Sequence, residues 1–245
     1  ISVPANFDPN EPIVFFMDMN ANAVANQHDD GGWIACGYLS WDDLAAYLDW
    51  AGLRPMTELE YEKAARGPFD PVMFEYAWGD WRAVRTEGLT DENTRDEIAN
   101  NPLANSVHGF SGMTGLEPFS GPIRVGAFAK ANTSRHQAGA GYYGNMELSG
   151  NLWEMVVTIG NEAGRNFRGI HGNGQLLNDS EQDAGFTNIP AQYWPSVYFN
   201  TPGHGYRGGS WRYPADAMMI SSRLVAAHSV NGRYAETGGR GARTA

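Results

Sequence analysis

The sequence contains a single cysteine, Cys36, in 245 residues. One thiol excludes an intrachain disulfide, a redox-active CxxC pair and a zinc site built from several thiolates. Cys36 follows the apolar residues Trp33, Ile34 and Ala35, and a free cysteine in such surroundings is commonly a small buried residue. We therefore expect Cys36 to lie in the core, with a nucleophilic role as the alternative.

Long apolar runs and basic residues are also scarce. No stretch of 18 or more apolar residues occurs, which predicts that the chain does not insert into a membrane. Lys and Arg number 17 against 28 Asp and Glu, a formal net charge of −11. Because an acidic surface repels phosphate backbones, we expect no nucleic-acid partner, in spite of the Arg-Gly tail at residues 239–243.

Common enzyme signatures are absent from the sequence. It has no GxSxG nucleophile elbow, no phosphate-binding loop and no dinucleotide fingerprint. The six histidines are His28, His108, His136, His171, His204 and His228. No two of them have the HxxxH spacing that places both on one helical face, so the spacing indicates scattered surface histidines.

Glycine, in contrast, is abundant, with 30 residues that follow no period. This pattern predicts a loop-rich fold with many tight turns. Within it, Ser40 and Asp43 have capping-box spacing at the start of a predicted helix that runs to Trp50 and stops at Gly52. The face predicted to be buried consists of Leu44, Tyr47, Leu48 and Ala51.

A second helix is predicted directly after the first. Thr57 and Glu60 form its capping arrangement, and Gly67 and Pro68 end it. Its predicted apolar residues are Leu59, Tyr61, Ala64 and Ala65.

Three motifs then follow one another along the chain. Residues 54–67 read RPMTELEYEKAARG, residues 149–154 read SGNLWE, and residues 207–211 read RGGSW before a closing GRGAR at 239–243. Together they resemble the formylglycine-generating-enzyme family, whose fold is a variant of the C-type lectin fold. The resemblance implies a loop-rich α+β domain with low regular secondary structure over residues 34–245. Residues 1–33 have no counterpart and are interpreted as an interface or a truncated part of the domain.

Large tryptophans and arginines would support such a fold. The expected buried anchors are Trp41, Trp50, Trp78, Trp153 and Trp211. The expected structural arginines, bonded to backbone carbonyls, are Arg207, Arg223 and Arg243.

The oxidases of this family use two cysteines after the RGGSW motif, which bind copper and react with oxygen and a substrate thiol. In this sequence those positions fall near Tyr213 and Met218. Because a phenol and a thioether cannot replace a thiolate nucleophile and soft copper ligand, we expect no formylglycine generation. The alternative is a metal-dependent oxidoreductase of the formylglycine-generating and sulfoxide-synthase superfamily with a non-standard site.

The resemblance also implies one or two structural Ca²⁺ sites, since calcium accepts flexible oxygen geometry. The residues carried over to the second site are Glu147, Gly150, Leu152 and Glu154. Those carried over to the first site are Asn105, Ser106, Glu117 and Phe119. The alternative for all of them is an ordinary role in turns and caps.

A retained scaffold without catalytic cysteines predicts a non-catalytic binding or structural domain, secreted or at the cell surface. Residues 207–243 resemble the variable region of diversity-generating retroelement proteins, where exposed side chains recognise ligands. The candidate residues for a protein or glycan ligand are Arg212, Tyr213, Asp216, Met218, Ser221, Leu224, His228, Asn231, Tyr234 and Glu236. Alternatively, the chain is a subunit of an extracellular assembly, with a strand near residues 14–17 for pairing.

Overall fold

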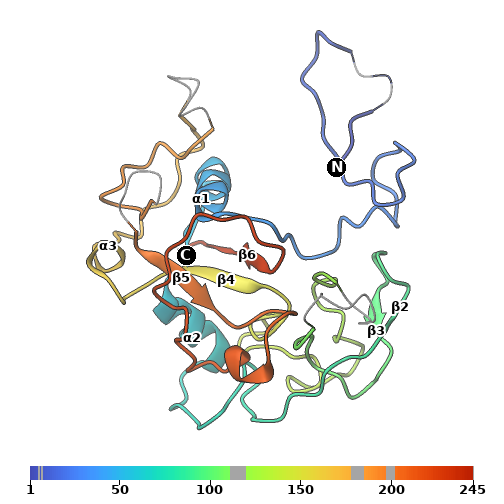
Figure 1. Cartoon of the computed structure of the whole chain (residues 1–245), viewed down its shortest axis with the longest axis vertical. Helices are drawn as coiled ribbons and strands as arrows, with labels where there is room; N and C mark the ends of the chain where they lie inside the picture. Colours follow the sequence, from blue (N-terminus) through green and yellow to red (C-terminus); the bar gives the residue numbers. More distant parts are fainter. Residues whose placement is uncertain (5, 7, 111–119, 178–184, 197–201, 245) are drawn as a thin grey trace.

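A three-stranded sheet forms the centre of the molecule (Figure 1). The computed structural model describes residues 1–245 except 5, 7, 111–119, 178–184, 197–201 and 245. In the sheet, β4 (Trp153–Val157) lies between β5 (His204–Arg207) and β6 (Thr237–Gly239). β4 is antiparallel to β5 and parallel to β6. The SGNLWE and RGGSW motifs thus meet at one end of neighbouring strands.

The other regular elements are short, as the abundant glycines predict. β1 (Arg54–Pro55) pairs with β7 (Gly241–Ala242), and β2 (Leu89–Thr90) pairs with β3 (Ile98–Ala99). A short helix α3 (Glu162–Arg165) and a 3₁₀ helix (Ala215–Met218) complete the described elements. The expectation of a loop-rich α+β domain is confirmed.

The two predicted helices are confirmed, with both capping boxes. α1 (Trp41–Trp50) begins after Ser40, and α2 (Glu58–Arg66) begins after Thr57. The predicted buried face of α1 is wrong in part: Leu44 and Leu48 are buried as predicted, but Tyr47 is 56% exposed and Ala51 is also exposed. In α2, Leu59 is likewise exposed.

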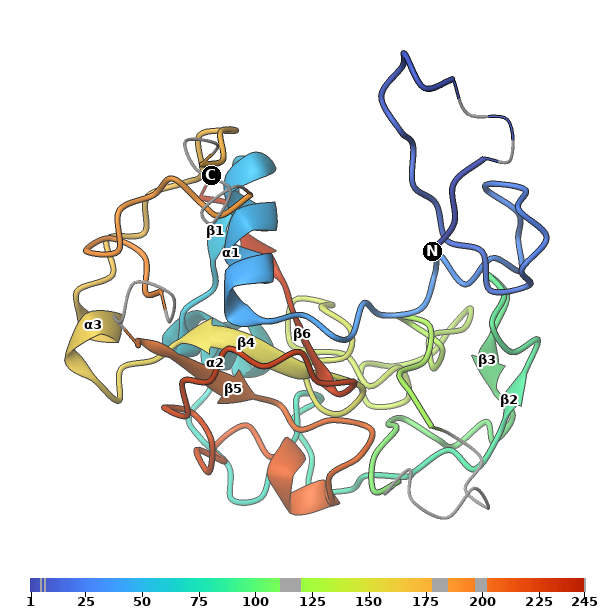
Figure 2. The ribbon, with the colours of Figure 1, turned by 45° about the horizontal axis from the view of Figure 1, so that its top comes forward.

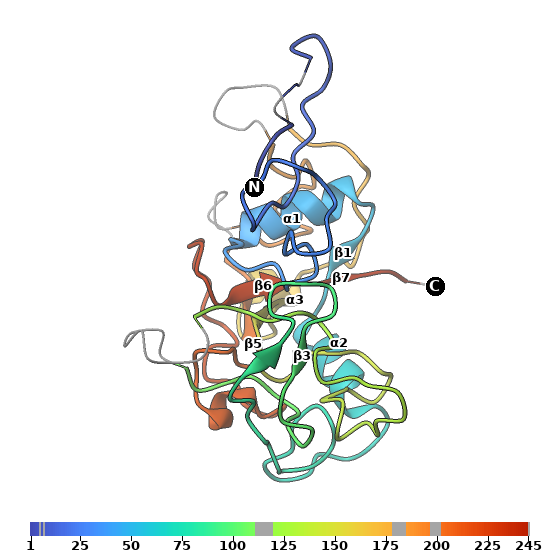
Figure 3. The same cartoon turned by 90° about the vertical axis from the view of Figure 1, so that its right-hand side faces the viewer.

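The helices lie on opposite faces of the sheet (Figures 2 and 3). Alternation along β4 explains this arrangement, because successive strand side chains point to opposite faces. Trp153, Met155 and Val157 pack in one core cluster with α1 residues, including Leu44 and Leu48. Val156 packs in another cluster with Tyr61 and Ala65 of α2.

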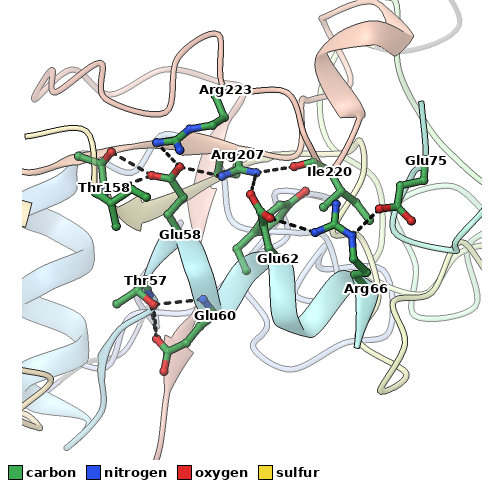
Figure 4. Close-up of polar contacts among 12 residues, drawn as sticks. Thr57, Glu58, Glu60, Glu62, Arg66, Glu75, Thr158, Arg207, Ile220 and Arg223 are labelled. Atoms are coloured by element: carbon green, nitrogen blue, oxygen red, sulfur yellow. Dashed lines mark hydrogen bonds and ion pairs between the residues drawn. The ribbon is translucent and has the colours of Figure 1, made fainter. Parts of the chain in front are cut away.

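An ion-pair network lies between α2 and the sheet (Figure 4). It comprises the carboxylates Glu58, Glu62 and Glu75 and the guanidinium groups of Arg66, Arg207 and Arg223. Arg207 is fully buried; it lies 3.0 Å from Glu58 and 2.8 Å from Glu62, and it donates to the backbone carbonyl of Ile220. Helix α2 is therefore fastened to the RGGSW strand by charge as well as by apolar contact.

The arginine and tryptophan predictions hold for some residues only. Arg207 is a structural arginine as expected, while Arg223 is half-exposed and pairs with Glu58, and Arg243 is exposed. Trp50 is 64% exposed and is no anchor, because α1 turns this side chain to solvent. Trp194, which was not among the predicted anchors, is buried, and its indole N–H donates to the carbonyl of Ile170.

Residues 1–33 form an arm that extends away from the sheet (Figures 1 and 2). An antiparallel bridge between Ser2 and Phe16 joins the start of the arm to its middle. Val14 and Phe15 are 64% and 67% exposed. In the described part of the chain, no helix has the length and apolar character needed to cross a membrane.

Candidate functional site

An aromatic pocket of about 150 Å³ lies on the α1 face of the sheet, beside β4 and β6. Its main lining residues are Trp153, Tyr206, Tyr213, His228, Tyr234 and Glu236. Trp153 and Tyr206 are held rigidly, because both belong to the sheet and to its core cluster. Tyr213 and Tyr234 come from the loops that follow β5 and precede β6.

The aromatic side chains of the pocket are arranged edge to face. The rings of Trp153 and Tyr213 have centroids 5.3 Å apart at an interplanar angle of 68°, a favourable arrangement for the ring quadrupoles. The Tyr206 hydroxyl donates to the carbonyl of Val230 at 3.2 Å. Burial raises the pKa of Tyr206 to about 12, so this phenol stays neutral. The pocket thus presents aromatic surface beside one carboxylate, Glu236.

Glu236 is mostly buried, with 8% of the residue exposed. One of its oxygens lies 3.5 Å from the guanidinium of Arg212, which is half-exposed at the rim. A rim ion pair of this kind is weak and easily exchanged, so a ligand could compete for either partner.

The predicted binding residues divide into two groups. Those exposed at the surface are Arg212, Tyr213, Asp216, Ser221, Leu224, His228, Asn231 and Tyr234. The expected exposure is wrong for Met218, which is completely buried, and for Glu236, which is largely buried. Of the predicted set, Tyr213, His228, Tyr234 and Glu236 share the aromatic pocket.

Met218 and Tyr213 mark the positions that the resemblance assigns to the oxidase cysteines. Met218 packs with Tyr76 and Trp78, and a Cβ on Gly150 would lie 3.0 Å from its sulfur. Its backbone carbonyl accepts a hydrogen bond from the Ser149 hydroxyl at 2.9 Å. Met218 is therefore a core residue, and its side chain is not exposed to a ligand.

The SGNLWE loop is shaped by its own polar residues. The Asn151 side chain accepts from the Ile123 N–H at 3.0 Å and donates to the Ile123 carbonyl at 3.2 Å. Gly150 has a φ of +91°, and a Cβ there would approach the Val107 carbonyl to 2.6 Å. The loop consequently carries Glu154 into the sheet at a fixed position.

The carboxylate cluster consists of Glu147, Glu154 and Arg240. Both glutamates are buried and, with Leu152, line a cavity of about 230 Å³. Arg240 Nε donates to Glu154 Oε1 at 2.8 Å, and a second guanidinium nitrogen contacts the same oxygen. Burial raises the pKa of Glu147 to about 7, although its Oε1 accepts from the Gly126 N–H at 3.0 Å.

These residues do not fit a resident calcium ion in the arrangement observed. Calcium needs six to eight oxygen ligands at close range, whereas a guanidinium already occupies Glu154 Oε1 and the Met146 carbonyl. Across the described residues, no group of three or more His, Cys, Asp or Glu side chains is placed to hold a metal.

The first predicted calcium set is only partly described, because Glu117 and Phe119 lie outside the described residues. The side-chain oxygen of Asn105 accepts from the Val84 N–H at 2.8 Å. The Ser106 hydroxyl lies 3.1 Å from His108 Nδ1. Both residues thus have roles in loop structure, and calcium at this set stays a prediction.

Cys36 is exposed, so the expectation of a core cysteine is wrong. The residue borders an open cavity of about 640 Å³ that is lined by residues of the arm and of the domain, among them Met19 and Ile123. Its apolar neighbours in the sequence do not enclose the thiol, since Trp33 is itself 54% exposed.

Sequence reasoning missed Tyr206 and Arg240 as site residues. Strand alternation in residues 153–157, WEMVV, places Trp153 and Glu154 on opposite faces, but it does not point to Tyr206 on the neighbouring strand. No local pattern identifies Arg240, which reaches Glu154 only because β6 pairs with β4.

The sequence matches the family described as "Sulfatase-modifying factor enzyme 1-like domain" over residues 37–245. The chain belongs to this family. The formylglycine-generating enzyme of Thermomonospora curvata is 33% identical over 120 residues, which cover 49% of this chain and 32% of that protein. The "Inactive C-alpha-formylglycine-generating enzyme 2" of Mus musculus is 30% identical over 136 residues, which cover 55% and 35%. The chain thus spans about a third of the length of these relatives.

Proposed function

We propose that this family member is a non-catalytic recognition domain whose ligand binds in the aromatic pocket. The proposal rests on where the structure places the two residues that correspond to the oxidase cysteines. Tyr213 forms part of the pocket wall, and Met218 is fully buried in the core. A similar relative bears the name of an inactive enzyme, which also favours a role without thiol chemistry.

The pocket suits one small group of a larger ligand, such as a single sugar ring or amino-acid side chain. Its volume is about 150 Å³, less than the 300–1,000 Å³ typical of pockets for whole small molecules. Aromatic faces bind the C–H surface of sugars and also cations, and Glu236 offers an acceptor or a counter-charge. We infer a C-type-lectin-like scaffold for this surface and, from the net charge of −11, a secreted or cell-surface location.

The test is binding to arrays of defined glycans and of extracellular proteins, followed by titration of any hit. Wild type is compared with the Tyr213→Ala/Tyr234→Ala double variant, and with Tyr143→Ala as the matched control. Tyr143 is 58% exposed and does not line the pocket. We expect at least a tenfold loss of affinity in the double variant and no change in the control. A ligand whose affinity survives the double substitution would rule out this pocket as its site.

The non-catalytic part of the proposal has its own test. Copper-loaded protein is mixed with a cysteine-containing peptide, and oxygen consumption is recorded. We expect no uptake above the rate of free copper; turnover that depends on the protein would contradict the proposal.

The arm supports a second role as a subunit of an extracellular assembly. Val14 and Phe15 expose apolar surface away from the sheet, and such exposed segments commonly mark interfaces. Analytical ultracentrifugation of the full chain and of Val14→Ser/Phe15→Ser checks this role. We expect a concentration-dependent oligomer that the double substitution dissociates, and a monomer at all concentrations would exclude self-assembly through the arm.

A further inference from the structure

The carboxylate cluster holds a positive charge in the place where the family resemblance predicts a calcium ion. Glu147 precedes the SGNLWE loop and Glu154 is its last residue, and both line the same cavity of about 230 Å³. Arg240, the residue that directly follows β6, also lines this cavity. The pairing of β6 with β4 thus places the Arg240 guanidinium beside Glu154.

The guanidinium contacts the types of oxygen that calcium binds. Arg240 donates to the carboxylate oxygen Oε1 of Glu154 through two nitrogens and to the main-chain carbonyl of Met146 at 3.1 Å. Calcium would bring such oxygens to 2.3–2.6 Å. These oxygens lie farther from the nitrogens of a guanidinium than from a calcium ion, because hydrogen bonds place donor and acceptor at 2.7–3.2 Å. The two cations cannot share these oxygens.

One oxygen of the cluster is left without a partner. Glu154 is 5% exposed, and its Oε2 is buried without a hydrogen bond. The guanidinium thus satisfies one oxygen of Glu154, and the other oxygen remains a buried acceptor without a donor. Such an atom is costly, and it is available to a cation that reaches it.

We propose that Arg240 is the resident cation of this loop and replaces the calcium ion there. A corollary is that removing the arginine side chain leaves a cradle of oxygens that binds a divalent cation. The proposal concerns how the scaffold is held together and is independent of the ligand of the aromatic pocket.

The experiment measures calcium content and thermal unfolding in wild type and in variants of Arg240 and Glu154. For wild type, we expect no stoichiometric calcium that depends on Glu154, and no change in melting temperature with EDTA or millimolar Ca²⁺. Arg240→Met should melt at a lower temperature, and Ca²⁺ should restore part of the loss. Its calcium affinity, measured calorimetrically, should exceed that of wild type at least tenfold. Arg240→Met/Glu154→Gln should not respond to calcium.

Two outcomes would overturn the proposal. One is wild-type protein that contains calcium which Glu154→Gln removes, because the ion would then coexist with the arginine. The other is a folded Arg240→Met variant with no gain in calcium affinity. If Arg240→Met does not fold, Arg240→Lys is used in its place: we expect it to bind no calcium, since it retains the charge, and calcium binding by this variant contradicts the proposal.

Discussion

Two ionic centres lie near the same face of the sheet, and they differ in charge balance. In the ion-pair network beneath α2, three carboxylates meet three guanidinium groups, and Arg207 is completely buried. In the carboxylate cluster, Arg240 pairs with Glu154, Glu147 lies in the same cavity without an ion pair to the guanidinium, and Glu154 Oε2 has no partner. Each centre has one buried atom without a partner, the donor Arg207 Nε in the balanced centre and the acceptor Glu154 Oε2 in the unbalanced one. Only the acceptor can take up a cation.

The largest expected effect comes from breaking the balanced centre at Arg207. Arg207→Met leaves the buried carboxylate of Glu58 with less compensation, and loss of one partner of a buried pair costs about 3–5 kcal/mol. We expect a decrease of this size in the free energy of unfolding, measured with urea. Arg223→Met is the matched control, because this guanidinium also pairs with Glu58 but is 44% exposed. Equal losses in both variants would refute the central role of Arg207.

His204 is fully buried rather than at the surface, and acid should reveal its effect on stability when wild type is compared with a variant that lacks this ring. Burial lowers the pKa of His204 to about 4 from 6.5, so the native state keeps this ring neutral while the unfolded chain binds a proton. The free energy of unfolding should therefore decrease by about 3 kcal/mol through this residue as the pH falls from 6.5 to 4. Urea unfolding at both pH values should show that loss in wild type relative to His204→Gln.

Carboxylates such as Glu60 and Glu147 are the same in wild type and in His204→Gln, so their titration cancels when the two proteins are compared. The pKa of Glu60, hydrogen-bonded to Arg54, is lowered to about 2 despite partial burial, so it stays ionised throughout the window. If His204→Gln loses as much stability as wild type between pH 6.5 and 4, His204 is not the responsible group.

The smallest effect is expected at an exposed pair, Arg233 with Asp43. The two side chains are 2.6 Å apart, but Arg233 is 68% exposed, and exposed pairs contribute little because water and salt screen them. Arg233→Met should leave the melting temperature unchanged within error. A shift comparable to that of Arg207→Met would remove the distinction between buried and exposed centres.

The sequence was sufficient for features that depend on near neighbours. Both capping boxes act between residues three positions apart, so Ser40 and Thr57 could be placed as caps without any knowledge of the fold. The motifs also predicted the family correctly. Aromatic residues of the predicted surface, Tyr213 and Tyr234, do line one pocket.

Features that depend on distant pairing could not be predicted. Whether Tyr47 faces the core is decided by where the sheet lies against α1, and the apolar pattern along the helix predicted its burial wrongly. Arg240 reaches Glu154 through the register of β4 and β6, which leaves no local trace. Met218 is buried because the 3₁₀ helix turns it beneath Gly209, and spacing from the RGGSW motif does not reveal that turn.

The pairing of early and late segments has a consequence for how the domain is made. Arg54 pairs with Ala242, and the Thr237 hydroxyl bonds the carbonyl of Leu39, 198 positions away. During synthesis, α1 and β4 emerge from the ribosome long before β6 exists to cover them. Such non-local contacts slow folding and prolong the exposure of apolar surface. The nascent chain should therefore depend on chaperones until residues 237–242 are released, and only then should it become resistant to proteases.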